Sequence, residues 1–594
     1  MPIDYSRAKR AIDYNFSQMG TFRENRYKFV KQYVGANYSK NGSSEKIPVN
    51  YMMLATCIYV QRLVSANPQA FVSNNIQSLK PQAINLGLAC NQLIKEINYK
   101  RTMQLVVLDA IFGMGIVKKG LTSKSKVEFN GFTHDVGQCY IDHVDLDDFV
   151  FDMSAKKIDQ CGFMGNKYRR PYDLVLNSGL YDPELIKKCV RQKNNQYRKN
   201  SAAGGDEEIE GISRGGDTYN AETYLDYIDL IDIWFPYEGK FVTMPYSYEQ
   251  TDWTTPLREV DFEGPENGPY NILGFHDVPG QLLPLPPAAA WLELNVMANK
   301  IFRKLGRQSD RAKTILAVMK GGEKDGKNIT DASDGDVIGA SNPDKCREYK
   351  FGGVDNVGLA FFLQVKQLFS YHAGNLDSLG GLGAISETVG QDKLMNESSS
   401  VTINGMQSRV YDFSKIDVSD IAWYIWYDPF VEIPFTKPVK GTDITIPYIF
   451  TEEDKEGDFL DYNFSIVPYS MQEDTPSTKE MKLRGIMANH ITPITPMMQQ
   501  QGVMLNCSEY IEFVGRLSNM PELQSMFIYA EPNAAQNAKP IGTPASKTSH
   551  RTYERINRPG STIGGQANAM TAALSGMDSG QQNSQAASIM GSVA

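Results

Sequence analysis

The spacing of apolar and polar residues divides the chain into helical and strand-like regions. Residues 5–35 follow a helical pattern in which Arg and Lys are interleaved with Tyr and Phe, and 50–68 form a mostly apolar helical segment that Pro68 ends. A longer helical pattern runs from Pro81 to Gly113, where glycines end it and a strand is expected. The amino-terminal part is therefore predicted to be mainly helical.

Two later regions change to the period of two that is typical of strands. Residues 125–168 include CYIDHVDLDDFVFD, in which apolar and polar residues alternate, and two short helices are expected over 171–197. A second strand region begins at Tyr224 and contains a predicted hairpin turn at Glu238–Gly239. Together with the helical segments, these strands predict an α+β fold that is mainly α.

The helix with the clearest pattern is predicted over 288–313, after the proline-rich segment PGQLLPLPP, whose prolines favour a helix start. Apolar residues at steps of three and four form a narrow packing seam: Trp291, Leu294, Ala298, Ile301 and Leu305. Cations at steps of four, three and four form a separate stripe: Lys300, Lys304, Arg307 and Arg311. Such a stripe is typical of a solvated helix face, where the dipole favours cations near the C-terminus, and equally of a surface that faces a polyanion.

Short strands and Gly/Asp turns are predicted over 314–353, and a second helix over 354–372, with apolar residues on one side of it. The residues of that side are Val357, Phe361, Val365, Leu368 and His372. The stretch LGGLGAISETVGQDK then occupies 379–393, and Thr388 with Gln391 forms a capping pair before a long helix toward Trp426.

The centre of this glycine-rich stretch offers little side chain and no charge: Gly380, Gly381, Leu382, Gly383 and Ala384. A phosphate cradle would need a preceding strand and a suitably placed lysine, and a catalytic lid would need an active site, and the sequence shows neither. The stretch is therefore interpreted as a contact loop that touches a passing rod-like molecule without gripping it.

The last part of the chain changes in character. Residues 429–467 return to strand spacing and 474–530 to helical spacing. After Arg558 the only charged side chain is Asp578, and the tail consists mainly of small and polar residues. A segment of this composition buries little apolar surface and is expected to be disordered.

Composition narrows the possible classes of function. The formal net charge of −9 disfavours tight binding of DNA as the main role, because proteins that grip phosphates are normally basic. The seven cysteines are dispersed without a CxxC pair, which indicates reduced thiols in a cytoplasmic setting. No apolar run approaches the roughly 18 residues of a membrane span, and the start of the chain does not resemble a secretory signal.

One segment partly matches a phosphate-binding loop. GGEKDGKN places Gly321, Gly326 and Lys327 at the P-loop spacing, but Asn328 stands where a magnesium-binding Ser or Thr is needed. The residues that follow do not predict the helix that would receive phosphates. A charged hairpin tip is the favoured interpretation.

Two clusters could in principle hold a metal. DHVDLDDFVFD is acidic enough for a two-metal site, but strand alternation would leave little more than Asp145 and Asp147 together, so a solvated strand edge is favoured. His134, Cys139 and His143 form the only local cluster suited to zinc, and zinc binding is not expected there. No catalytic motif is present, so neither catalysis nor a metal or cofactor is expected.

The order of these elements resembles the portal proteins of tailed bacteriophages, especially the short-tailed type. The resemblance covers about 15–530. The first half of the family's wing is similar to NYMMLATCIYVQRLVSANPQAFV and LVVLDAIFGMGIVKKGL. Its strand segment is similar to HVDLDDFVFDMSAKKIDQCGFMG, and its loop-to-helix junction is similar to GAISETVGQ. Two departures affect the boundaries: the second stem helix carries few charges, and the acidic region 221–278 is longer than in some relatives.

The resemblance implies a division of the chain into the parts of a portal subunit. These are a wing over 1–285, a first stem helix over 286–313, a clip over 314–353, a second stem helix over 354–375, a tunnel loop over 376–392, a long wing helix with returning strands over 393–473, a helical crown over 474–530 and a low-complexity tail over 531–594.

The implied function is that of a homo-oligomeric ring, typically of twelve copies, at one capsid vertex of the virion, assembled in the host cytoplasm. Double-stranded DNA enters and leaves through its channel, and terminase, tail adaptor proteins and the major capsid protein dock on it; no membrane is involved. Candidate residues facing DNA or a neighbouring subunit are Lys300, Lys304, Arg307, Arg311 and Lys393. The alternatives are another ring-forming virion protein and a metal-dependent nucleic-acid enzyme that uses Asp145 and Asp147.

Overall fold

The computed structural model divides the chain into two compact units, Met1–Glu473 and Asp474–Ala594. It describes residues 3–34, 49–121, 127–129, 132–134, 139–194, 222–246, 255–341, 345–376, 389–428, 431–438, 445–467, 470–471, 483–485, 487–495, 510 and 514. The protein is α+β, with more helix than strand. In the second unit the described residues include a π-helical turn, Met487–Ile491.

Five helices begin the first unit and contribute much of its core: α1 (Tyr5–Gln18), α2 (Gly20–Val34), α3 (Tyr51–Leu63), α4 (Lys80–Glu96) and α5 (Tyr99–Phe112). Helix α3 ends at Leu63, before the predicted stop at Pro68. The prediction of one long helix from Pro81 to Gly113 is wrong, because the segment forms two helices. Asn98 adopts a left-handed conformation with φ of 52°, which separates α4 from α5.

Two antiparallel sheets follow in the first unit. A three-stranded sheet has the order β12 (Tyr270–Leu273), β2 (Gly115–Leu121) and β5 (Cys139–Val144). A six-stranded sheet has the order β11 (Arg258–Asp261), β10 (Lys240–Pro245), β9 (Glu222–Phe235), β7 (Met164–Pro171) and β6 (Phe149–Phe151), with β8 (Gln192–Asn194) also paired to β9. The hairpin turn between β9 and β10 lies where it was predicted, and Gly239 has the positive φ of 63° that such a turn favours.

Smaller elements complete this unit. The two short helices predicted over 171–197 are α6 (Tyr172–Asn177) and α7 (Pro183–Lys188). Four further strands form two pairs, β1 (Ala70–Asn74) with β17 (Tyr462–Ile466) and β15 (Ile433–Pro438) with β16 (Thr445–Phe450). Strands β3 (Val127–Phe129) and β4 (Phe132–His134) form a third pair.

Strand β2 lies between the six-stranded sheet and the 39-residue helix α14 (Val389–Tyr427). Its consecutive lysines point to opposite sides. Lys118 pairs with Asp232 of β9 at 2.5 Å, whereas Lys119 pairs with Asp420 and, at 3.4 Å, with Asp417 of α14. All five side chains are almost fully buried, so these ion pairs connect three layers of the unit.

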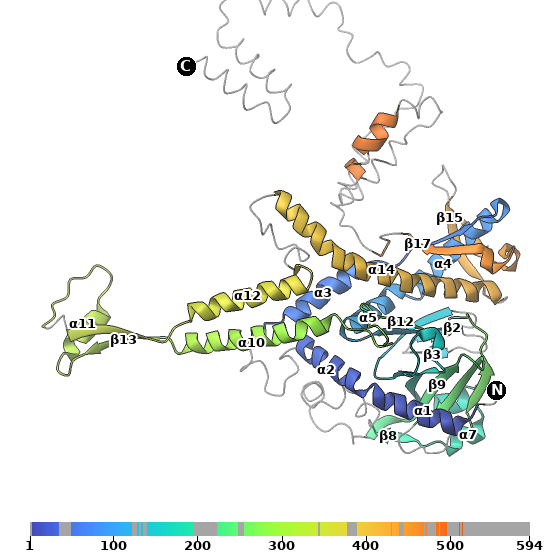
Figure 1. The fold of residues 1–594 in the computed structure, drawn as a ribbon, viewed down its shortest axis with the longest axis horizontal. Helices are drawn as coiled ribbons and strands as arrows, with labels where there is room; N and C mark the ends of the chain where they lie inside the picture. Colours follow the sequence, from blue (N-terminus) through green and yellow to red (C-terminus); the bar gives the residue numbers. More distant parts are fainter. Residues whose placement is uncertain are drawn as a thin grey trace, which may run out of the picture. The chain divides into compact units, whose positions relative to one another are not determined.

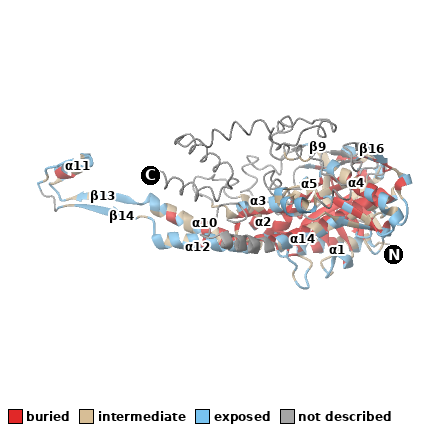
Figure 2. Cartoon of the chain, turned by 90° about the horizontal axis from the view of Figure 1, so that it is seen from above, coloured by how far each residue is buried: buried red, intermediate tan, exposed pale blue. Residues whose placement is uncertain are grey.

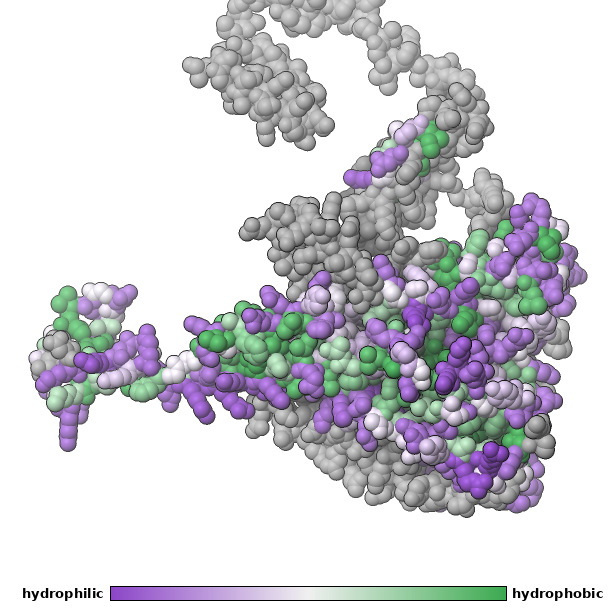
Figure 3. Space-filling view, in the orientation of Figure 1, coloured by the Kyte–Doolittle hydropathy of each residue, from purple (hydrophilic) through white to green (hydrophobic). Residues whose placement is uncertain are grey.

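A helical hairpin extends from this core (Figure 1). Its arms are α10 (Ala288–Asp310) and α12 (Asn356–His372), and between them lie β13 (Lys313–Val318), α11 (Glu323–Asp331) and β14 (Cys346–Phe351). Figure 2 shows that most of this hairpin is exposed, in contrast to the buried core from which it starts. Hydrophobic side chains gather along it in Figure 3, with a hydrophilic edge where α10 runs.

Candidate functional site

The amino-terminal half of α10 is anchored in the core by the seam predicted from the sequence. Trp291 is buried, and its ring centroid lies 5.4 Å from that of Tyr59 and 6.5 Å from that of Phe369. Ala298 and Leu305 are buried as well, whereas Leu294 and Ile301 are partly buried. The seam therefore faces the core in the first half of α10 and α12 in the second half.

Two asparagines that the sequence did not single out fix how α10 is rotated about its axis. The side chain of Asn299 accepts a hydrogen bond from the Val49 backbone N–H at 2.8 Å and donates one to the Val49 carbonyl at 3.2 Å. Asn295 donates to the Gln32 side chain at 3.2 Å. Their spacing of four residues beside an apolar seam is the signal that could have revealed them.

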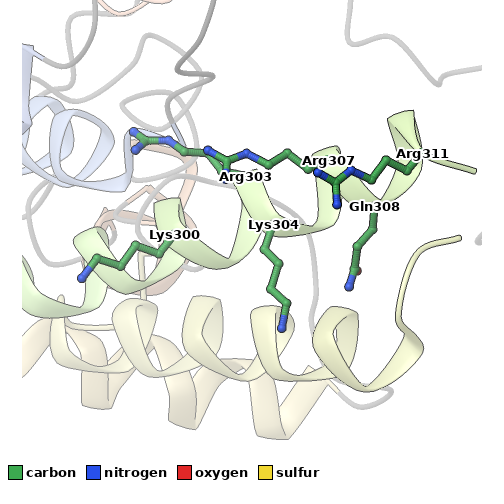
Figure 4. Close-up of a pocket in the computed structure, with 6 residues that line it drawn as sticks. All are labelled: Lys300, Arg303, Lys304, Arg307, Gln308 and Arg311. Atoms are coloured by element: carbon green, nitrogen blue, oxygen red, sulfur yellow. The ribbon is translucent and has the colours of Figure 1, made fainter. Parts of the chain in front are cut away.

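The cation stripe of α10 lines a groove of about 470 Å³, called the α10 groove below and shown in Figure 4. Its lining residues are Lys300, Arg303, Lys304, Arg307, Gln308 and Arg311. Four of them were predicted, and Arg303 and Gln308 were missed. Arg303 could have been found, because it lies four residues before Arg307 on the same side of the helix.

The α10 groove concentrates positive charge without internal compensation. In the described part of the chain, none of its five cations forms a salt bridge within 4.0 Å. The Arg303 Nε is buried and has no hydrogen-bond partner. Like charges at spacings of three and four residues repel one another, so an anion bound here would relieve that repulsion. This chemistry suits an anion with several negative charges.

The orientation of the groove follows from helix geometry. At 100° per residue, the groove cations lie on average about 140° around α10 from the seam that starts at Trp291. The half of α10 that carries them extends beyond the core contacts with α2, α3 and α5 and packs on α12, where Phe302 lies 5.5 Å from Phe362. The cations are therefore displayed on a surface that the core leaves open.

Helix α12 has an exposed apolar surface that the sequence only partly anticipated. Of the five residues predicted along one side, only Val365 is buried, and Val357 is 77% exposed. The helix packs on α10 through a neighbouring stripe, which includes Val365 and Phe369. The described part of the chain thus leaves much of the predicted apolar side of α12 uncovered.

Several predicted site residues cannot be placed. The tunnel-loop candidates Gly380, Gly381, Leu382, Gly383 and Ala384 lie outside the described residues. The backbone of Lys393 belongs to α14, but its side chain is not among those described. The tail 531–594 also lies outside the described residues.

The acidic segment after β5 surrounds an arginine. Arg26 of α2 lies 2.9 Å from Asp109, 2.9 Å from Asp145 and 3.5 Å from Asp147. The predicted solvated strand edge is wrong at Asp147, which is 6% exposed. The reason is that strand alternation stops at Val144, and the following turn folds these carboxylates onto Arg26.

Histidine 143 belongs to the same network. Its Nε2 lies 2.7 Å from Asp109. Burial alone would raise the pKa of Asp109, but Arg26 and His143 outweigh this effect and hold that pKa below its usual value. Burial raises the pKa of the Cys139 thiol, which opposes the thiolate form that binds zinc. Within the described residues, no three His, Cys, Asp or Glu side chains are grouped so as to hold a metal ion.

The segment that resembles a P-loop has another structure. Gly321 and Gly322 form a turn, and Gly326 and Lys327 lie inside α11 rather than in a loop before a helix. A Cβ on Gly326 would come within 2.6 Å of Val318, so this glycine permits α11 to pack on β13. The segment does lie in the connection between the paired strands β13 and β14, so the predicted position at a hairpin tip is confirmed, but the tip contains a short helix that was not predicted.

The buried lysines of β2 were also missed. Asp417 accepts hydrogen bonds from Tyr99 and Asn271, each at 2.8 Å, in addition to its pairing with Lys119. Burial raises the pKa of Asp417, and these partners offset the rise only in part. Two consecutive lysines in the apolar strand GIVKKGL are the available signal, because buried lysines need acidic partners.

Comparison with models of protein families found no match, and comparison with curated proteins found none either. None of the described helices has both the length and the apolar composition needed to cross a membrane.

Proposed function

We propose that this chain is the subunit of a portal ring of the tailed-bacteriophage type. In this role, about twelve copies encircle a channel at one capsid vertex, and double-stranded DNA passes through it during packaging and ejection. Terminase, tail adaptor proteins and the major capsid protein would dock on the assembled ring. Hydrolysis of ATP would take place in the terminase, so the subunit itself needs no catalytic site.

The observation that carries this proposal is the α10–α12 hairpin. One arm displays five cations in the α10 groove, none of which forms a salt bridge within the described part of the chain. The other arm carries Lys366 as its only Lys, Arg, Asp or Glu and exposes apolar residues. A helix pair in which one arm has a cationic edge and the other carries a single charge suits a wall built from many copies around a polyanion.

The net charge of the chain and the local charge of the α10 groove suit a protein through which DNA passes rather than one that holds DNA. Each phosphate neutralised by a cation adds affinity that must be lost again when DNA advances. A net charge of −9 per chain repels DNA overall, while the α10 groove supplies local positive charge. Five cations on one helix could therefore guide a duplex without holding it in place.

The competing enzyme hypothesis has less support from the described residues. Its candidate ligands Asp145 and Asp147 both lie within 3.5 Å of Arg26, which competes with a divalent cation for their oxygens.

Electron microscopy of the purified protein in negative stain tests the proposal. We expect closed rings with a central hole wide enough for duplex DNA. A monomer under all conditions would overturn the proposal, and so would a ring with a closed centre. The second result would favour the alternative of a virion protein that forms rings without DNA transit.

A further inference from the structure

We infer that α12 joins neighbouring copies of this chain through two different flanks, so that each copy contacts one neighbour with each flank. This inference rests on the proposed ring and adds the surface that builds it. It starts from the exposed Val, Leu and Phe side chains of α12, which fall into two separate groups.

The two groups lie on opposite sides of the helix. Flank one consists of Val357, Phe361 and Leu368, which are 77%, 46% and 49% exposed. Flank two consists of Leu359 and Leu363, which are 42% and 50% exposed. At 100° per residue, flank one lies about 80° and flank two about 120° around the helix from the buried stripe of Val365 and Phe369, one on either side of it.

The rest of α12 explains why these flanks remain open. Val365 and Phe369 pack toward α10 and the core, and Phe369 also meets Tyr51 of α3 at 5.4 Å between ring centroids. Gln364 and Gln367 are exposed and lie between the flanks on the side away from α10. The helix therefore has one stripe for its own chain, two apolar flanks of which the second borders Lys366, and between the flanks a strip that also carries the exposed Tyr371.

A second copy of the chain is the occupant that fits this arrangement. A single apolar flank would suit a two-fold dimer, in which the same surface meets itself. Two flanks made of different residues suit a heterologous contact, in which flank one of one copy meets flank two of the next. That contact repeats around a ring and leaves no copy with an unused flank.

Charge favours the same occupant. Lys366 is the only Lys, Arg, Asp or Glu on α12, so identical helices approach one another with little repulsion. The repelling cations lie on α10 in the α10 groove, whose residues belong to a different helix. Neighbouring hairpins can thus meet along α12 while the cationic edges of α10 stay exposed.

Variants that add charge to one flank at a time test the inference. Phe361→Glu with Leu368→Glu blocks flank one, and Leu359→Glu with Leu363→Glu blocks flank two. Gln364→Glu with Gln367→Glu adds the same charge to the polar strip and serves as the control. Mass photometry gives the oligomeric state, and circular dichroism with thermal unfolding checks that each variant folds.

We expect the control to assemble like the wild type, and each flank variant alone to remain monomeric. An equimolar mixture of the two flank variants should give a dimer with one copy of each, because one intact pair of flanks remains. Rings formed by either flank variant would overturn the inference while leaving the proposed ring intact. A dimer formed by one flank variant alone, or no dimer in the mixture, would also overturn it. A wild-type monomer would instead overturn the proposed function itself.

Disulfide cross-linking is a second test, and it does not require the fold to tolerate glutamate on α12. A chain carrying both Phe361→Cys and Leu363→Cys should give a ladder of covalent oligomers on oxidation, with wild type oxidised in parallel as the background of native cysteines. Each single cysteine variant alone should show only that background. Covalent dimers from either single variant would indicate a two-fold contact, and a double variant without a ladder would contradict the inference.

Discussion

At the scale of single residues, the first unit depends on buried charges whose partners are distant in sequence. Lys119 is 2% exposed and lies between Asp417 and Asp420 of α14, about 300 residues away along the chain. Arg26 gathers three carboxylates in the same manner. Removing one partner of such a group leaves a buried charge uncompensated, which destabilises a protein much more than the loss of a surface pair.

Lys119→Met should therefore lower the free energy of unfolding at pH 7 by about 3–5 kcal/mol, measured by chemical denaturation. Lys415→Met is the matched control, because Lys415 is exposed on α14, two residues from Asp417. The control should change stability by less than about 0.5 kcal/mol. A change in the free energy of unfolding for Lys119→Met as small as that expected for the control would show that the buried ion pairs contribute little.

The loss caused by Lys119→Met should shrink as the pH falls from 7 toward 5. Burial raises the pKa of both Asp417 and Asp420, and Lys119 opposes this rise. A carboxyl whose folded pKa lies above its unfolded value stabilises the fold at low pH, and this contribution is lost as the pH rises through the folded pKa. Asp109, whose pKa is lowered, has the opposite dependence and loses its contribution in acid. A deficit that grows in acid would contradict the assignment.

At the scale of elements, the sequence predicted features that depend on neighbouring residues, but it did not predict pairings between distant segments. The helical spacing of α10 and the turn at Glu238–Gly239 depend on neighbours in sequence, and the structure has both. The pairing of β1 with β17 joins residues nearly 400 positions apart, and no local pattern indicates it. The break at Asn98 was missed because the helical spacing continues through it.

The candidate site shows the same division. The cation stripe was visible because its residues repeat along one helix, and the structure places four of them in one groove with Arg303. The sequence did not show which side of α12 is covered by the rest of the chain, because that depends on how the helix is rotated against α10. The buried role of Asp147 depends on Arg26, which lies 121 residues earlier.

Replacing four groove cations by Gln should weaken DNA binding without preventing ring assembly. The variant changes Lys300, Lys304, Arg307 and Arg311 together. Fluorescence anisotropy at several salt concentrations should show a smaller salt dependence, by about 0.9 in the slope of log K against log salt for each phosphate that a cation no longer neutralises.

A control with the same change in charge separates the groove from the rest of the surface. It changes four exposed lysines on α4 and α7: Lys80, Lys95, Lys187 and Lys188. The control should keep the wild-type slope. Unaltered slope, DNA packaging and assembly in the groove variant would exclude these cations from both the channel and the subunit contacts.

Bulky residues at Gly381 and Gly383 should hinder packaging or retention of DNA while rings still form. The physical reason is that the predicted tunnel loop needs small, uncharged residues to touch the duplex without gripping it. Packaged DNA per particle is the measurement, with ring formation checked by electron microscopy. Normal packaging by such a variant would remove the loop from the proposed channel.

At the scale of the whole molecule, the proposed ring would make stability depend on protein concentration. Apolar flanks that are exposed in one chain would be covered in the assembly, and association of folded copies stabilises them by mass action. The midpoint of thermal unfolding should therefore rise with the concentration of the wild-type protein. The flank variants should show no such rise, and a concentration-independent wild type would argue against assembly.

The position of β2 between two acidic layers has a consequence for how the strand can be aligned. If β2 slipped by one residue in one direction, Gly120 would replace Lys119 opposite Asp417 and Asp420. A slip in the other direction would put Val117 opposite Asp232. Either slip leaves a buried carboxylate without a cation. The two adjacent lysines therefore specify the register of β2 on both of its faces.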